Sequence, residues 1–583
     1  MTNATTVWGA MLDPQAVLPE YPRPQLVRDG YLNLNGYWDY AVTAAEANAP
    51  HRYDGRILVP FSPEAPLSGV NRQLQPDERL WYRRTFRLPA GFHRGRVLLH
   101  FGAVDQSCEI YCNGAAVGSH VGGYLAFTLD ITDHLIDGDN VLVVAVRDVS
   151  DTAFHSTGKQ RLRRGGIWYT AQSGIWQTVW LESVPPVYVR DITYVPRLDR
   201  DSVEVTVHTD TAATAGVTVY DGDDIVASVR LETDVATEVP LPSPRWWTPQ
   251  DPHLYRVTVT LTDDVVHGYF GMRSFGLGLD ESGHRRLLLN GRPFFHAGVL
   301  DQGYWPDGLY TAPSDEAMIH DIQTMKDLGF TMLRKHIKIE PLRWYHHCDR
   351  LGMLVWQDLV NGGAPAAPEV AKPPAAGEHL DDTDVERFGR GDAAGREEFK
   401  AELEQTVSLL RNVVSLAVWV PFNEGWGQFH ADDAVDRLRV LDPSRPIDQA
   451  SGWHDQGGGD IHSIHVYVDD FVMPADRDDR VLALTEYGGY SLKVEGHHVG
   501  DEVFGYRGYE SADELGAAFA DLHRRQILPA IAEGLSATVY TQLSDVEDEL
   551  NGLLTYDRKV VKLPSSLVTP LTRRLRIEGA RHI

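Results

Sequence analysis

The spacing of apolar residues changes near residue 278, and this change restricts the fold more than any other feature of the chain. Before it, short segments such as 96–104 and 140–148 alternate apolar and polar residues, which is the period of a half-buried strand. After it, the segment 313–329 places Met318, Ile322 and Met325 on one helical face. The sequence therefore predicts an all-β first part followed by an α/β second part.

The all-β part divides into two units. Segments 107–118 and 178–184 continue the alternation, and turn residues such as Asn113-Gly114 separate them, which is typical of an antiparallel sandwich. Pro185-Pro186 ends this unit. Alternating segments then continue to residue 278 over the length of an immunoglobulin-like domain. We expect a β-sandwich at 1–184 and an immunoglobulin-like β-sandwich at 185–278.

Apolar strands alternate with amphipathic helices over residues 279–583. Helices are expected at 313–329, 341–352, 396–412 and 510–534, and strands at 330–333, 353–358, 416–422, 461–468, 481–488 and 537–545. This order predicts a (β/α)8 TIM barrel. The Ala- and Pro-rich stretch 362–379 is interpreted either as a long loop at the active-site end or as a plain surface insertion.

Two glutamates lie where predicted barrel strands end. Glu424 follows the strand at 416–422, and Glu486 lies near the end of the strand at 481–488. Catalytic groups of such barrels lie at the carboxyl ends of the strands. Two carboxylates facing each other there suit cleavage of a glycosidic bond, since one can protonate the leaving oxygen while the other attacks the anomeric carbon. We assign Glu424 as the acid/base and Glu486 as the nucleophile.

Other residues near strand ends are candidates for substrate binding. Arg334 is expected to orient Glu486, Tyr467 to hydrogen-bond it, and Trp419 and Trp426 to form an apolar wall that favours protonated Glu424. For Asp301, Asp358 and Trp305, packing at the rim is an equal alternative. No metal site is expected, because His346 and His347 lack a third ligand at suitable spacing. The substrate-binding candidates are Asn423, Arg334, His336, Asp358, Asp301, Trp305, His465, Tyr467 and Gln542.

Several motifs together resemble glycoside hydrolase family 2, the family of β-galactosidase, β-glucuronidase and β-mannosidase. They are VWVPFNEGWGQ, LTEYGG, LNGRPFFHAGVLDQG and RRGGIWYTAQSGIWQTVWLE. The resemblance implies a jelly-roll sugar-binding domain at 1–184, an immunoglobulin-like domain at 185–278 and a catalytic barrel at 279–583. It also implies an exo-acting, retaining mechanism with Glu424 as acid/base, Glu486 as nucleophile and Asn423 on the sugar 2-hydroxyl. No cofactor is implied.

The sequence departs from the family pattern at positions that contact the sugar, so the identity of the substrate sugar is not determined. Thr331 stands where the family usually has Asn, Lys335 where it has Ser, and GVLDQG replaces the usual Val-Asn-x-His pattern. The expected substrate is of the β-galactoside type. These departures count against the usual galactopyranoside pocket and permit a β-galactofuranoside or an arabinofuranoside. β-Glucuronidase or β-mannosidase activity is an alternative, and so is a non-catalytic carbohydrate-binding protein. A phosphate-binding barrel is disfavoured, because no Gly-rich loop follows the last strands.

The net charge of the chain disfavours several classes of binding partner. The formal net charge is −28, which disfavours nucleic acid, an anionic membrane surface and an anionic substrate. Three cysteines, no secretory pattern at the start and no run of 18 apolar residues predict a cytoplasmic protein without a membrane span. The expected partner is a carbohydrate substrate, and the chain could form a homo-oligomer, as relatives in the family do.

Overall fold

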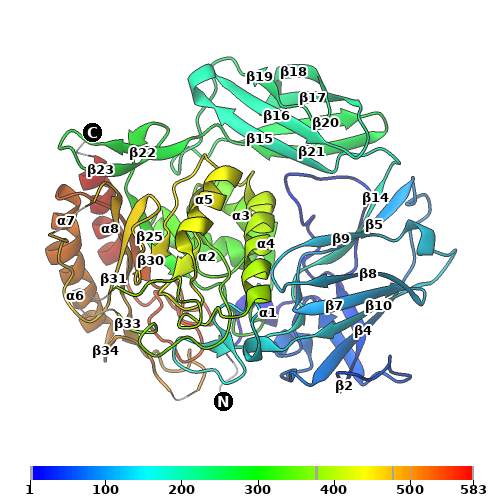
Figure 1. Ribbon diagram of the computed structural model, residues 1–583, viewed down its shortest axis with the longest axis horizontal. Coiled ribbons are helices and arrows are strands. Elements are labelled where there is room, and N and C mark those ends of the chain that lie inside the picture. The colour runs from blue at the N-terminus through cyan, green and yellow to red at the C-terminus, as the bar shows by residue number, and fades with distance from the viewer. Residues whose placement is uncertain (1–3, 374–378, 476–477, 501, 581–583) are drawn as a thin grey trace.

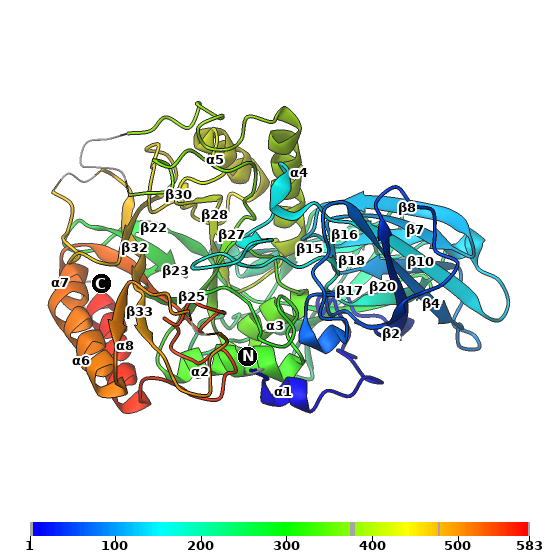
Figure 2. The same ribbon diagram turned by 90° about the horizontal axis from the view of Figure 1, so that it is seen from below.

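The computed structural model describes residues 4–373, 379–475, 478–500 and 502–580. Figure 1 shows two β-sandwiches and a barrel, with the N-terminal sandwich in blue and cyan, the middle sandwich in cyan-green above, and the barrel on the left. Figure 2 shows the short helix α1 (Val7–Ala10) beside the barrel helices rather than within the sandwich that follows it. Of the stretch 362–379, residues 374–378 lie outside the described residues, and the rest forms no helix or strand longer than a bridge.

The N-terminal sandwich consists of two antiparallel sheets, with strand orders β1-β14-β5-β9 and β3-β2-β4-β10-β7-β8. Alternate residues of its strands, such as Leu142, Val144 and Val146, are buried between the sheets. The predicted jelly-roll is confirmed. Its main strands are β1 (Tyr31–Asn33), β2 (Gly36–Ala44), β3 (Gly55–Val59), β4 (Glu78–Phe86), β5 (Arg96–Phe101), β7 (Ser107–Cys112), β8 (Ala115–Val121), β9 (Phe127–Asp130), β10 (Asn140–Arg147) and β14 (Val179–Val184).

The middle sandwich packs sheet β15-β16-β19 against sheet β18-β17-β20-β21. Inward-facing residues such as Val205, Val217 and Val257 form its core, because β-branched side chains pack well on a pleated surface. This confirms the immunoglobulin-like unit. Its strands are β15 (Asp191–Arg197), β16 (Ser202–His208), β17 (Thr214–Asp221), β18 (Asp224–Glu232), β19 (Thr237–Pro240), β20 (Tyr255–Leu261) and β21 (Asp264–Phe270).

The barrel contains parallel strands in the order β28-β27-β26-β25-β35-β32-β31. The two ends of this order, β28 and β31, are joined through β30. Strand β30 pairs in parallel with β29, which continues β28. On its other side, Ser451 of β30 hydrogen-bonds Ser463 of β31, which closes the barrel. The predicted TIM barrel is confirmed. Its strands are β25 (His296–Asp301), β26 (Met332–Lys335), β27 (Leu354–Asp358), β28 (Leu416–Val420), β29 (Phe422–Asn423), β30 (Ala450–Ser451), β31 (Ile461–Val466), β32 (Val481–Gly488) and β35 (Leu535–Thr541).

Helices surround the barrel, and their ends follow local capping signals. The Ser314 and Ser511 side chains accept hydrogen bonds from Ala317 N and Glu514 N at the starts of α2 and α6. The helix predicted at 510–534 is interrupted by a π-helical turn at His523–Ile527. In the described chain, no helix is both long and apolar enough to cross a membrane. The helices are α2 (Asp315–Asp327), α3 (Leu342–Leu351), α4 (Ala393–Leu410), α5 (Ala431–Leu441), α6 (Ala512–Leu522), α7 (Leu528–Ala532) and α8 (Ser565–Ala580).

Several short strands lie outside the main sheets of the three domains. A three-stranded sheet of β22 (Phe275–Leu279), β23 (Arg285–Leu289) and β24 (Arg292–Pro293) precedes the first barrel strand, and β33 (Tyr490–Leu492) pairs with β34 (Arg507–Tyr509) after β32. In the N-terminal sandwich, β6 (Val104–Asp105) pairs with β13 (Gly174–Ile175), and β11 (Gln160–Arg161) with β12 (Tyr169–Thr170). The pair β11–β12 belongs to the part of the sandwich that reaches the barrel.

Candidate active site

The carboxyl ends of the barrel strands bring the two predicted glutamates together. Glu424 directly follows β29, Glu486 lies in β32, and His465 lies in β31 between them. One side-chain nitrogen or oxygen from each of these residues lies within 4.8 Å of the others. Retaining glycosidases hold their carboxyl groups about 5–5.5 Å apart, whereas inverting enzymes need roughly 6.5–9.5 Å to admit a water. The two glutamates therefore lie close enough to act on one bound ligand.

His465 links the two carboxylates. Its Nδ1 lies 2.9 Å from Glu424 Oε1, and its Nε2 lies 3.7 Å from Glu486 Oε1 and 3.0 Å from Ser451 Oγ. The three side chains are also donors that a metal ion could use. Both imidazole nitrogens already have partners, so a metal would have to displace either Glu424 or Ser451. The cluster is better suited to holding Glu424 in place than to binding a metal.

Glu486 is held in its ionised form. Arg334 Nη1 donates to Glu486 Oε1 at 3.2 Å, and the Tyr467 hydroxyl donates to Oε2. Burial by itself would raise the pKa of Glu486, but His465, His336 and Arg334 outweigh it and lower the pKa to about 2. A nucleophilic carboxylate must carry its charge at the working pH, and this environment keeps it charged.

Arg334 is the centre of a buried network. It donates to both oxygens of Asp358, at 2.9 and 3.0 Å, and to Asn423 Oδ1 at 2.8 Å. Asp358 also lies 2.7 Å from His336 Nδ1. A guanidinium with fixed partners on three sides cannot turn away from Glu486. Asp358 thus contacts Arg334 and His336 in the described structure. These contacts are closer to the structural alternative for Asp358 than to direct sugar binding.

Three of the predicted binding residues keep one buried polar atom without a hydrogen bond in the described structure: His336 Nε2, Asn423 Nδ2 and Gln542 Oε1. Buried polar atoms are nearly always hydrogen-bonded, so each such atom suggests a ligand group. Arg334 holds the oxygen of the Asn423 amide, which leaves the amide nitrogen as the free donor. A polyhydroxylated ligand would satisfy these atoms.

Other candidates lie outside this cluster. Asp301 accepts from Lys335 Nζ at 2.7 Å, and Trp305 packs against Trp8 and under Arg558. Neither has a described contact with the carboxylate pair. Trp419 was expected to stand beside Glu424, but its indole donates to Asp442 at the end of α5, because its side chain points from β28 towards the helices. That expectation is wrong.

Two aromatic contacts were not predicted from the sequence. Tyr506 stacks on Tyr467 with ring centroids 3.7 Å apart, and Trp168 of the N-terminal sandwich meets Trp426 edge-on at 5.1 Å. Tyr506 lies outside the barrel strands, and Trp168 lies in another domain, so strand-end reasoning could not find them. Tyr506 therefore packs on the Tyr467 ring, whose hydroxyl hydrogen-bonds Glu486, and Trp168 joins the jelly-roll to the segment that follows Glu424.

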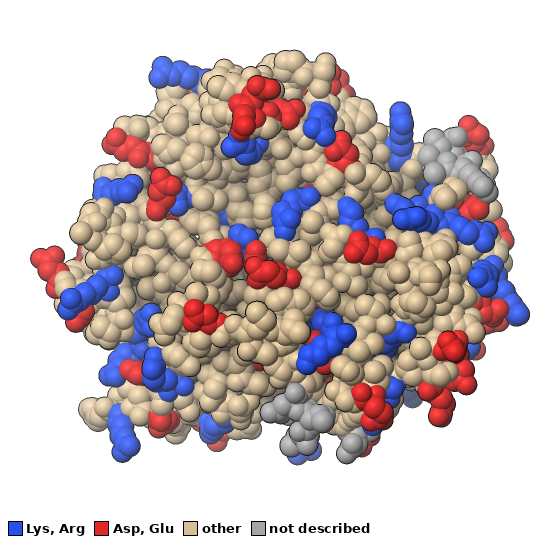
Figure 3. All heavy atoms as spheres, turned by 180° about the vertical axis from the view of Figure 1, so that it is seen from behind, with Lys and Arg blue, Asp and Glu red and all other residues tan. Residues whose placement is uncertain are grey.

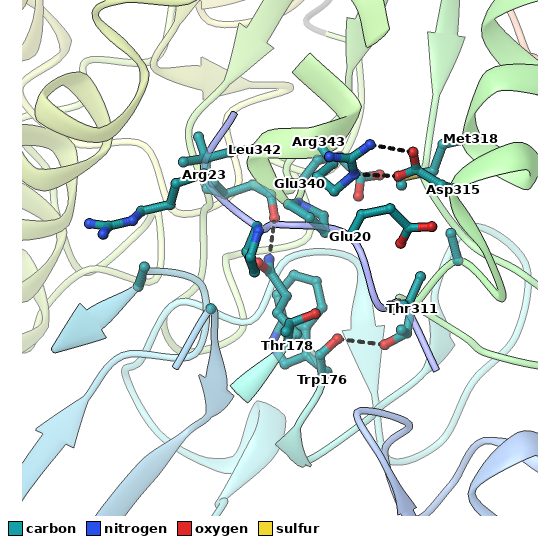
Figure 4. Close-up of a pocket in the computed structure, with 18 of the residues that line it drawn as sticks. Glu20, Arg23, Trp176, Thr178, Thr311, Asp315, Met318, Glu340, Leu342 and Arg343 are labelled. Atoms are coloured by element: carbon teal, nitrogen blue, oxygen red, sulfur yellow. Dashed lines mark hydrogen bonds and ion pairs between the residues drawn. The ribbon is translucent and has the colours of Figure 1, made fainter. Parts of the chain in front are cut away.

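A separate pocket lies between the N-terminal segment, the jelly-roll and the barrel. Figure 4 shows its lining residues, including Glu20, Trp176 and Leu342, and its volume is about 80 Å³. Thr311 Oγ1 donates to Trp176 O at 2.6 Å across it, which fastens the jelly-roll to the barrel. Neither Glu424 nor Glu486 lines this pocket. It is a packing gap between domains, distinct from the carboxylate site.

The low pKa of Glu486 predicts a pH-dependent contribution to stability. Because folding lowers this pKa from 4.5 to about 2, ionised Glu486 stabilises the fold above about pH 4.5, and this contribution is lost as the pH falls towards 2. We expect the free energy of unfolding of the wild type to fall more steeply than that of Glu486→Gln over this range, by up to about 3 kcal/mol. Urea unfolding at a series of pH values measures the difference. If the free energy of unfolding depended on pH in the same way in both proteins, Glu486 would not have a low pKa in the folded state.

Comparison with known proteins agrees with this geometry. Three family models match the chain: the sugar binding domain of glycosyl hydrolases family 2 at residues 66–185, the family 2 model at 187–273 and the family 2 TIM barrel domain at 282–475. The three-part fold and the carboxylate pair define the class, the glycosyl hydrolases. The chain belongs to glycosyl hydrolases family 2.

The similar proteins are longer or more distant. The β-galactosidase of Alteromonas mediterranea is 26% identical over 78% of this chain and 44% of its own length, and that of Vibrio vulnificus is 25% identical over 91% and 54%. The chain thus spans about half the length of these curated relatives. The solved β-D-glucuronidase of Dictyoglomus thermophilum superposes with a TM-score of 0.73 at 17% identity, over 95% of this chain and 98% of its own. At that identity the likeness concerns the fold.

Proposed function

We propose that this chain is a retaining, exo-acting β-glycosidase that removes a terminal β-linked sugar by double displacement. The observation that carries the proposal is the pair Glu424 and Glu486, with oxygens within 4.8 Å of each other at the mouth of the barrel. Glu486 is ionised beside Arg334, and Glu424 is held by His465.

In the first step Glu424 gives its proton to the glycosidic oxygen, and Glu486 attacks the anomeric carbon, so that the C–O bond breaks as an ester to Glu486 forms. The ester has lost the charge of Glu486, which removes a negative neighbour of Glu424, now ionised. In the second step Glu424 takes a proton from water, and the water oxygen displaces Glu486. Arg334 and Tyr467 stabilise the carboxylate as it leaves.

The sugar is proposed to be of the β-galactoside type, with a β-galactofuranoside or an arabinofuranoside as variants. Both curated relatives described above are β-galactosidases. β-Glucuronidase activity is the second candidate, because a β-D-glucuronidase shares the fold. β-Mannosidase activity stays an alternative from the sequence. The acidity of the chain favours a neutral sugar over an anionic one.

A panel of nitrophenyl glycosides tests the proposal. It should contain β-pyranosides, including the galactoside, mannoside and glucuronide, together with β-galactofuranoside and arabinofuranoside. We expect release of nitrophenol from one neutral glycoside, and loss of that activity in the Glu424→Ala, Glu486→Ala double variant. Binding of the sugars without hydrolysis by the wild type would favour the non-catalytic alternative and overturn the enzyme proposal.

We further propose that the chain works in the cytoplasm without nucleic acid, membrane or cofactor, and that it could form a homo-oligomer. Figure 3 shows Lys and Arg side chains interspersed with Asp and Glu on one face, which supports the absence of a basic surface for nucleic acid on that face. The net charge of −28 acts in the same direction.

A further inference from the structure

A loop of the jelly-roll domain enters the mouth of the barrel. The backbone nitrogens of Thr157 and Gly158 donate to Asn361 O, at 3.0 and 2.9 Å, just beyond strand β27. Gly158 has a φ of +61°, and a Cβ there would lie 2.9 Å from both the Tyr124 and the Tyr310 hydroxyl oxygens. The loop is therefore fitted closely against the barrel, and the residue after it is delivered at a fixed place.

That residue, Lys159, is 6% exposed, yet none of the described residues forms a hydrogen bond or ion pair with its ammonium group. The positive charge of Lys159 acts on two residues of the catalytic cluster. It lowers the pKa of Asp358, which burial raises, and it contributes to the low pKa of Glu486. The ammonium nitrogen is not among the fully enclosed polar atoms of the described residues, so it borders open space rather than packed protein. The donors of Lys159 are therefore available to a ligand at the site of Glu486.

Glu549 is a fourth buried carboxylate of this region, after Glu424, Glu486 and Asp358. Glu549 is 2% exposed, and its pKa is raised by burial and lowered by the charge of Lys159. Its Oε2 accepts from the Tyr169 hydroxyl of the jelly-roll, and its Oε1 accepts from Asn551 Nδ2 at 2.9 Å. Asn551 in turn accepts from Gln542, whose Oε1 is the unpaired atom noted above. Lys159 and Glu549 thus place a donor and an acceptor beside the catalytic pair.

We propose that Lys159 of the jelly-roll domain is a specificity-determining residue of the sugar subsite, which donates a hydrogen bond to a hydroxyl group of a neutral sugar while Glu549 accepts one. The proposal rests on the proposed glycosidase function and adds the chemistry of recognition to it. Vicinal hydroxyls can accept from an ammonium and donate to a carboxylate at the same time. A uronic acid would instead bring a further negative charge towards Glu486 and Glu549.

The test compares Lys159→Met with the wild type on the neutral nitrophenyl glycoside that the wild type cleaves, on its monodeoxy analogues and on the uronide of the same configuration. We expect kcat/KM on the parent to fall about 10- to 100-fold, as for loss of a hydrogen bond to a charged group. On the one deoxy analogue that lacks the contacted hydroxyl, variant and wild type should differ by less than about threefold. Arg163→Met removes a positive charge from an exposed position of the same loop and should leave kcat/KM within about twofold.

Three outcomes would overturn the proposal. They are an unchanged kcat/KM in Lys159→Met, an equal loss on the parent and on every deoxy analogue, and a preference for the uronide that Lys159→Met abolishes. The last would mean that Lys159 binds a carboxylate. Calorimetric binding of the free monosaccharides to wild type and variant gives a readout without turnover. If the wild type cleaves nothing but Lys159→Met still loses sugar binding, the glycosidase proposal fails and the role of Lys159 in recognition stands; unchanged binding would overturn that role.

Discussion

Replacing Glu486 with alanine should lower kcat by at least about a thousandfold, because it removes the carboxylate that forms the covalent intermediate. The change also leaves Arg334 with one acidic partner fewer, although Asp358 still accepts two hydrogen bonds from it. The fold should therefore persist near neutral pH. Steady-state rates on the preferred nitrophenyl glycoside, with circular dichroism to verify folding, measure the effect.

The matched control is Glu397→Ala, which removes a glutamate that is 73% exposed on helix α4. We expect its kcat to stay within about twofold of the wild type. A small anion such as azide, which fits the space left by the missing side chain, should restore part of the Glu486→Ala rate. Residual activity of Glu486→Ala within tenfold of the wild type would show that Glu486 is not the nucleophile.

Replacing Glu424 with alanine is expected to give a loss that depends on the leaving group. For a poor leaving group, which needs protonation, kcat/KM should fall about 10²- to 10⁴-fold. For dinitrophenolate, which leaves without a proton, kcat/KM should change little. The second step should still slow with either substrate, because no base remains to activate water, and a burst of dinitrophenol should precede a slow steady state.

Stopped-flow measurement of dinitrophenol release detects this burst, with Glu397→Ala again as the exposed-residue control. The dependence on the leaving group separates a general acid from a residue that merely holds the site together. A structural role would reduce the rates of all substrates by the same factor. Such a uniform reduction would contradict the acid/base assignment of Glu424.

The sequence predicted the barrel because its strands are apolar and its helices amphipathic. Strand β32 occupies Val481–Gly488, as expected, since an apolar run between polar residues has clear ends. The helix expected at 510–534 contains a π-helical turn that the apolar pattern does not reveal, because such a turn leaves the apolar faces on both sides directed at the core. The predicted domain boundaries at residues 184 and 278 stay predictions.

The site was predictable where it depends on single strands. Arg334, Glu486 and Tyr467 lie on barrel strands or just beyond them, and the contacts expected between them are present. The side of a strand on which a residue lies was harder to predict, as Trp419 shows. Lys159 was missed because a loop of another domain carries it, and periodicity within one segment says nothing about contacts between domains.

The covalent intermediate offers the most direct test of the central claim, that Glu486 attacks the sugar with Glu424 as acid. A 2-deoxy-2-fluoro glycoside with a good leaving group, built on the preferred sugar, slows both steps because fluorine destabilises the positively charged transition state. Mass spectrometry of the protein digested after reaction should find the fluorosugar on the peptide that contains Glu486. Turnover of the parent glycoside with no adduct on this peptide, and with inversion at the anomeric carbon, would contradict the account.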